Sequence, residues 1–183
     1  MSNKRQSLKD LQERLAKRLS EAKTQAISAS WLAVEVDRSR YLLPLVQSGE
    51  IFPWTSLQIV PYTQEWYAGV VSLRGGLHGV IDLFRFPGLR SDAESGRGSS
   101  SADRVSSESR LVSLHTALGV NAVLWVDRLL GLRNPAMFAA LGEAIPEASK
   151  FSPRTLIDHQ GVAWHELDLQ LLSTSPEFLA IAA

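Results

Sequence analysis

Short apolar runs, interrupted by glycine, proline or small polar clusters, are the feature that most limits how this chain can fold. From Trp31 onward they fall at 31–37, 41–46, 68–73, 79–84, 110–117, 121–132 and 161–169. Apolar runs of about four to eight residues between turn signals are typical of strands, because helices need about ten to twelve. Several short strands with turns every 8–12 residues or so predict an all-β barrel or sandwich.

Two hairpins can be placed from this pattern. Residues 31–37 and 41–46 flank a polar break, and Pro44 either puts the second strand at a sheet edge or displaces its pairing there. Residues 68–73 and 79–84 flank Gly75 and Gly76, which favours a tight turn between two paired strands. The stretch 138–154 has no clear period and is expected to be an irregular crossover. Residues 168–179 are expected to hold a short helix.

Composition excludes several classes of protein. The chain has 183 residues, of which 45% are hydrophobic and 21% charged, as in a folded domain. It has no cysteine, so disulfides, thiol nucleophiles and cysteine-ligated metal centres are excluded. No apolar run approaches the roughly 18 residues that span a bilayer, and the charged start has no secretory core. We therefore expect a cytoplasmic protein without direct membrane insertion.

Residues 1–29 differ from the rest of the chain in pattern and charge. An apolar stripe with helical spacing predicts an amphipathic helix; its members are Leu8, Leu11, Leu15, Leu19, Ala22 and Ala26. Residues 1–30 hold seven Lys and Arg against three Asp and Glu, an excess that residues 31–183 balance. The helix either docks on its own domain or binds a partner or a membrane surface.

A serine-rich stretch separates the two groups of strands. Residues 91–110 contain eight serines, two glycines and a single aliphatic residue larger than alanine, Val105. Such a segment cannot bury enough apolar surface to offset the entropy lost on ordering. We therefore predict a flexible loop over 91–109.

Candidate catalytic and metal-binding residues are few. The richest cluster, around Asp158, His159, His165 and Glu166, mixes residue types that bind metals, but strand alternation places its members on diverging faces. No nucleophile elbow or phosphate-binding glycine motif occurs. Asp82 and Asp127 lie inside apolar runs and are expected to cap turns or face the surface. We expect no catalysis, no metal and no cofactor.

Arg74 is the most promising recognition residue. It ends an apolar strand directly before Gly75 and Gly76, so its guanidinium should project from a stiff turn. A forked donor held in this way suits a partner's carboxylate or carbonyl groups. A solvated turn arginine is the alternative.

The motifs around this turn resemble those of the CheW-like family, the adaptors of bacterial chemosensory arrays. The sequence GVVSLRG at Gly69–Gly75 is followed by VIDL at Val80–Leu83, at the family's separation. Further similarity extends over about 31–179. Ser72 and Gly79 depart from the family's common asparagine and proline, and 91–109 lengthens a connection that is usually short.

The resemblance implies a fold and a function. The fold would be two small five-stranded SH3-like barrels sharing a core, over 30–179. The function would be non-enzymatic coupling of methyl-accepting chemoreceptors to a CheA-type histidine kinase in chemotaxis or twitching motility, at membrane-associated receptor arrays. The long N-terminal segment is more similar to adaptors of type IV pilus (twitching-motility) systems.

The resemblance also carries specific positions over to this chain. Gly69, Leu73, Arg74 and Gly75 would form the coupling motif, with Arg74 as the polar contact. Glu50, Leu45 and Ser48 match positions of the first barrel that are associated with partner contacts, while Asp82 and Asp127 match structural aspartates.

A small β-barrel nucleic-acid-binding protein is the main alternative function. Such proteins need clustered Lys and Arg interleaved with aromatic side chains. Here the surplus of positive charge lies in residues 1–30, and the remainder carries an equal negative surplus. We therefore expect no nucleic-acid partner.

Removal of residues 1–29 tests the predicted domain boundary. We expect the truncated chain to keep a cooperative thermal unfolding transition, because the strand pattern begins only at Trp31. Circular dichroism at increasing temperature measures this. Loss of the transition would show that the terminal segment belongs to the core.

Overall fold

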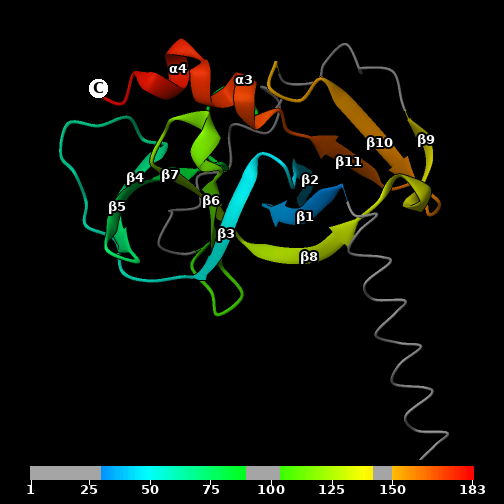
Figure 1. Ribbon diagram of the computed structural model, residues 1–183, viewed down its shortest axis with the longest axis horizontal. Coiled ribbons are helices and arrows are strands. Elements are labelled where there is room, and N and C mark those ends of the chain that lie inside the picture. The colour runs from blue at the N-terminus through cyan, green and yellow to red at the C-terminus, as the bar shows by residue number, and fades with distance from the viewer. Residues whose placement is uncertain (1–29, 90–103, 142–149) are drawn as a thin grey trace, which may run out of the picture.

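The structure, a computed structural model, describes residues 30–89, 104–141 and 150–183. The predicted terminal helix, and the predicted loop as far as residue 103, lie outside the described residues. The described strands form two sheets, one on each side of the molecule in Figure 1, with two short helices along its top. The predicted all-β class is confirmed, and the sheets contain six and five strands rather than five each.

The six-stranded sheet combines strands from both ends of the described chain. Its order is β8 (Arg128–Arg133), β1 (Trp31–Val36), β2 (Ser39–Pro44), β11 (Ala163–Glu166), β10 (Arg154–Asp158) and β9 (Phe138–Leu141). Neighbouring strands run antiparallel except β2 and β11, which are parallel.

The five-stranded sheet is built from the middle of the chain. Its order is β3 (Ser48–Pro53), β6 (Arg110–Leu114), β7 (Ala122–Val126), β5 (Gly76–Asp82) and β4 (Tyr67–Leu73). The central pair β5 and β7 is parallel, and the other pairs are antiparallel.

One large apolar core lies between the sheets. Strand β1 shows how the sequence builds it, because successive side chains of a strand point to opposite faces. Leu32 and Val34 enter the shared core, whereas Trp31 and Ala33 enter a second core inside the six-stranded sheet. A third core, around Trp125, fills the five-stranded sheet. Both faces of β1 are therefore apolar.

The C-terminal residues close the shared core. Helix α3 (Leu169–Thr174) begins where the Asp168 carboxylate accepts a hydrogen bond from the Leu171 N–H. Helix α4 (Pro176–Leu179) follows at once, with Ser175 accepting from the Phe178 N–H. The predicted helix is thus two short helices. They are divided just before Pro176, the first residue of α4, a position at which proline is favoured.

The first predicted hairpin is present, but its second strand is not at an edge. Asp37 and Arg38 form the turn, both with positive φ, as in the type I′ turns that suit hairpins. Strand β2 lies between β1 and β11 inside the sheet. Pro44 is tolerated because β11 pairs only with Tyr41 and Leu42, so its missing N–H falls beyond that pairing.

Two other sequence predictions are wrong. The apolar run 121–132 is divided at Asp127 into β7 and β8, which belong to different sheets. The stretch expected to be an irregular crossover contains β9 and the first residue of β10, which pair with each other. Short strands with few apolar alternations have no period for a sequence pattern to reveal.

Of residues 104–109, expected in the flexible loop, the two end residues, Arg104 and Ser109, are anchored in the fold, whereas 105–108 are exposed. The side chain of Arg104 is 8% exposed, and Ser109 is fully buried. Ser109 Oγ accepts from the Ser106 N–H at 3.0 Å. The packed structure therefore resumes at Arg104.

Gly69 is required by a close approach of two backbone segments. Its φ is +136°, and a Cβ there would lie 2.4 Å from the carbonyl oxygen of Gln58. Gln58 pairs with Val70 across this point, as the two reciprocal backbone hydrogen bonds of 2.8 and 2.9 Å show. The glycine lets the chain before β4 pack on the edge of the sheet.

Gly69→Ala is expected to destabilise the fold by about 2–5 kcal/mol, from backbone strain and the clash together. Gly161→Ala is the matched control, because Gly161 also has positive φ but a Cβ there would have no neighbouring atom within 4 Å. The control should lose only about 1–2 kcal/mol. Denaturant unfolding measures both, and equal losses would contradict the close-approach explanation.

Candidate partner-docking site

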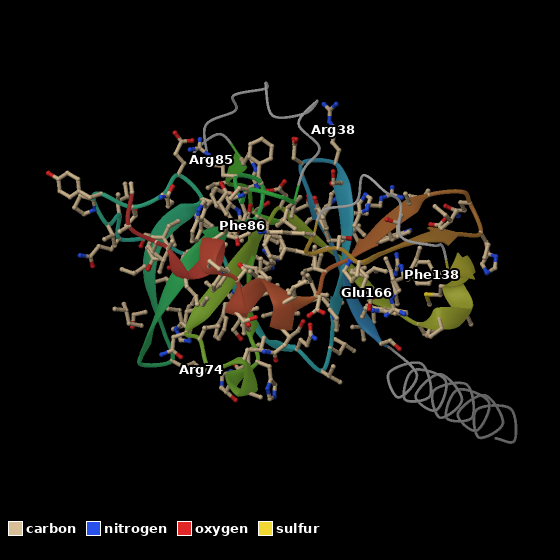
Figure 2. All side chains as sticks on the ribbon, turned by 90° about the horizontal axis from the view of Figure 1, so that it is seen from above. Arg38, Arg74, Arg85, Phe86, Phe138 and Glu166 are labelled. Atoms are coloured by element: carbon tan, nitrogen blue, oxygen red, sulfur yellow. The ribbon has the colours of Figure 1, made fainter. Side chains whose placement is uncertain are left out.

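Arg74 occupies the tip of the β4–β5 hairpin. Leu73 pairs with Gly76, which leaves Arg74 and Gly75 as the two turn residues, with φ of 48° and 82°. Positive φ at both positions is the type I′ geometry, which Gly75 adopts freely and Arg74 adopts at a cost. The side chain of Arg74 is 76% exposed. Figure 2 shows it pointing away from the body, on the opposite side from Arg38.

Glu50 lies on β3, and a bulge in that strand holds it in place. The register between β3 and β6 shifts between Ser48 and Ile51, which places Gly49 and Glu50 in the bulge. Ser113 Oγ accepts from the Glu50 N–H at 2.7 Å and donates to the Glu50 carbonyl at 3.2 Å. A Cβ on Gly49 would lie 2.4 Å from the same Oγ, so a larger residue there would displace the Ser113 side chain from these hydrogen bonds. Sequence reasoning did not identify Gly49 or Ser113.

Arg74 and Glu50 form an ion pair, with 2.9 Å between Nε and Oε2. Strands β3 and β4 are the two ends of the sheet order, so curling of the sheet brings a β3 residue to the β4–β5 turn. Both side chains are more than half exposed. An exposed pair of this kind contributes only about 0–1 kcal/mol to stability. The pair therefore presents polar groups at the surface rather than holding the barrel together.

Apolar side chains adjoin both members of the Arg74–Glu50 pair in the chain. Ile51 follows Glu50 and is 43% exposed, and Leu77 lies just beyond the turn at 63%. Buried apolar contacts with charged groups beside them are typical of protein–protein interfaces. The surface of Glu50, Ile51, Arg74 and Leu77 is here called the docking surface.

The other predicted site residues support this surface from inside. Leu73 is buried in the core of the five-stranded sheet, and Gly69 serves the backbone contact described above. Ser48 is buried, and its Oγ donates to the Pro44 carbonyl at 2.9 Å. Leu45 is half-buried against the shared core. Of the seven predicted positions, Arg74, Gly75 and Glu50 are thus exposed together.

The histidine cluster is not assembled as one site. His159 Nε2 lies 3.1 Å from the Ala136 carbonyl, and His165 Nδ1 lies 3.1 Å from Thr155 Oγ1. Glu166 accepts from Trp31 Nε1 at 2.8 Å and pairs with Arg154. Among the described residues, no three His, Cys, Asp or Glu side chains lie close enough to hold a metal ion.

Asp158 organises the β10–β11 turn. Its Oδ2 accepts from Trp164 Nε1, and its Oδ1 from the N–H groups of Gln160 and Val162, all at 2.9 Å. The indole donor, followed by the backbone donors, lowers the pKa of Asp158 below its usual value of 3.8. The Asp158 carboxylate thus stabilises the β10–β11 turn through these hydrogen bonds.

Comparison with known proteins identifies the family. The model of the CheW-like domain family matches residues 30–176, so the chain belongs to this family. The structure is similar to the crystal structure of the scaffolding protein TtCheW from Thermoanaerobacter tengcongensis, with a TM-score of 0.60. That alignment covers 82% of this chain and 95% of the other at 19% identity, and so concerns the fold alone. No curated protein matches the chain.

The described parts of the chain contain no helix long and apolar enough to span a membrane.

Asp158→Asn tests the role of this carboxylate. A folded-state pKa below the unfolded value stabilises the fold above the unfolded pKa, and the benefit is lost as pH falls through the folded pKa. We expect the variant to be less stable than the wild type at pH 7, and the difference to shrink as pH falls below 3.8. Urea unfolding at several pH values measures this. A difference that stays constant with pH would contradict the charge-based explanation.

Proposed function

We propose that the chain is a non-enzymatic adaptor that couples chemoreceptors to a CheA-type histidine kinase. Its membership of the CheW-like family supports this assignment. The single observation that carries it is the docking surface, where Arg74 and Glu50 are displayed on a two-residue turn and a strand bulge. Because this ion pair contributes little to the stability of the fold, recognition of a partner explains it better than a structural role does.

Coupling by such an adaptor needs no bond-making. Binding a receptor and a kinase at once raises their effective concentration for each other. A receptor state that binds the adaptor and kinase differently then shifts kinase activity by that difference in free energy, about 1–3 kcal/mol for typical allosteric coupling. Rigid surfaces transmit this difference better than mobile ones, because less of it is absorbed in ordering the adaptor itself.

Within this function, we place the adaptor in the cytoplasm, at receptor arrays on the membrane. A system controlling twitching motility is the preferred setting. The support for that preference is the basic sequence of residues 1–29, which lengthens the chain before the family domain begins at residue 30.

Arg74→Glu is expected to abolish receptor control of the kinase in a reconstituted array while leaving thermal unfolding nearly unchanged. The reversed charge removes the forked donor from the docking surface and repels Glu50. Arg38→Glu is the matched control, because Arg38 is also an exposed arginine with positive φ in a two-residue hairpin turn, but on the other sheet. The control should retain receptor control.

The double variant Arg74→Glu/Glu50→Arg separates two roles of the pair. It restores an ion pair inside the adaptor but leaves the wrong charges facing the partner. We expect coupling to remain lost. Full recovery would show that the pair acts within the adaptor and does not contact a partner.

A further inference from the structure

Between β7 and β8 the chain passes from one sheet to the other across one intervening residue, Asp127. Strand β7 ends at Val126 in the five-stranded sheet, and β8 begins at Arg128 in the six-stranded sheet. Asp127 between them is tied to the β1–β2 hairpin by its own N–H, which donates to the Glu35 carbonyl at 2.9 Å. Its Oδ2 accepts from the Asp37 N–H at 2.7 Å. Asp127 is therefore bound to the six-stranded sheet by two hydrogen bonds.

The buried side chain of Arg104 connects Asp127 to the five-stranded sheet. Arg104 Nη2 lies 2.7 Å from Asp127 Oδ1, and Nη1 lies 2.6 Å from Asp82 Oδ1. Asp82 ends β5 of the five-stranded sheet and is fully buried, and its Oδ1 also accepts from the Phe84 N–H. We call Arg104, Asp82 and Asp127 the Arg104 clamp.

Aromatic rings hold the guanidinium of the clamp in place. Its central carbon lies 4.4 Å from the ring centre of Phe84 and 4.8 Å from that of Trp125, both positioned by the five-stranded half. Stacking on two rings and a forked contact with two carboxylates leave the group little freedom to reorient.

The clamp is poorly suited to adding net stability. Buried ion pairs lose much of their attraction to the cost of removing charges from water. Here Arg104 Nε is also buried without a hydrogen-bond acceptor among the described residues, which adds a further cost. The apolar core between the sheets has the opposite character, since apolar association is strong but non-directional. The clamp, whose contacts are directional, can therefore contribute a defined orientation of one sheet relative to the other.

We propose that Arg104 is a positioning residue, whose bridge between Asp82 and Asp127 fixes the relative orientation of the two sheets. The docking surface lies on the five-stranded half, so an adaptor that binds a second partner through the other half depends on this orientation. This consequence rests on the proposed coupling function, whereas the orientation itself does not.

Spin-label distances test the orientation directly, and the absence of native cysteine makes the labels unique. One label pair, Ser72→Cys with Ala163→Cys, uses an exposed strand residue from each sheet. The control pair, Ser72→Cys with Thr116→Cys, places both labels on the side of the five-stranded sheet.

The test variant is the triple substitution Arg104→Met/Asp82→Asn/Asp127→Asn. It removes all three charges together, while asparagine keeps an oxygen for the Phe84 and Asp37 N–H groups. We expect a folded protein whose distance distribution between sheets shifts or broadens, with the control pair unchanged. Arg104→Lys keeps the charge but loses the fork, and should give a smaller change in the same direction.

Two outcomes would overturn the proposal: a triple variant with the wild-type distribution between sheets, or one that fails to fold, which would make the clamp a requirement for stability. In a reconstituted array, the folded triple variant should bind receptor and kinase singly but lose receptor control of kinase activity. If the wild type itself shows no coupling, the proposed function fails, while the distance result still decides the role of Arg104.

Discussion

The apolar core between the two sheets is the constraint on which the rest of the structure depends. It takes Leu32, Val34 and Leu43 from the six-stranded sheet and Ile81, Leu124 and Val126 from the five-stranded sheet, and α3 and α4 close it. Neither sheet could bury its inner face without the other, so the two barrels form one folding unit. The surfaces left outside this core are free to serve binding.

The docking surface shows how rigid backbone and exposed side chains divide their roles. Gly69 and Gly75 adopt positive φ at a close approach and at a turn, and Gly49 leaves room for the Ser113 side chain at the bulge. Ser48 and Leu73 secure the same region from inside. Arg74 and Glu50, in contrast, are exposed and contribute little to stability. The candidate site therefore combines buried residues that build its backbone with exposed residues that we propose contact a partner.

Sequence patterns predicted what local alternation and turn chemistry determine, including both hairpins and the exposure of Arg74. They missed what tertiary pairing determines. Strand β2 can lie inside the sheet and still contain Pro44, because β11 pairs only with Tyr41 and Leu42. The run 121–132 is divided at Asp127 because the chain changes sheets there. No sequence pattern indicated the ion pairs of Arg104, because this residue stands in a serine-rich stretch and its partners lie 22 and 23 residues away in the chain. Only the folded structure brings these three charges together.

A co-sedimentation measurement tests the central claim most directly. A receptor signalling fragment assembled on vesicles would be mixed with the regulatory domain of a CheA-type kinase, with and without this chain. We expect the chain to sediment with the receptor and to increase the amount of kinase domain that sediments. A chain that stays in the supernatant, or that leaves the sedimented kinase domain unchanged, would contradict the proposed coupling function.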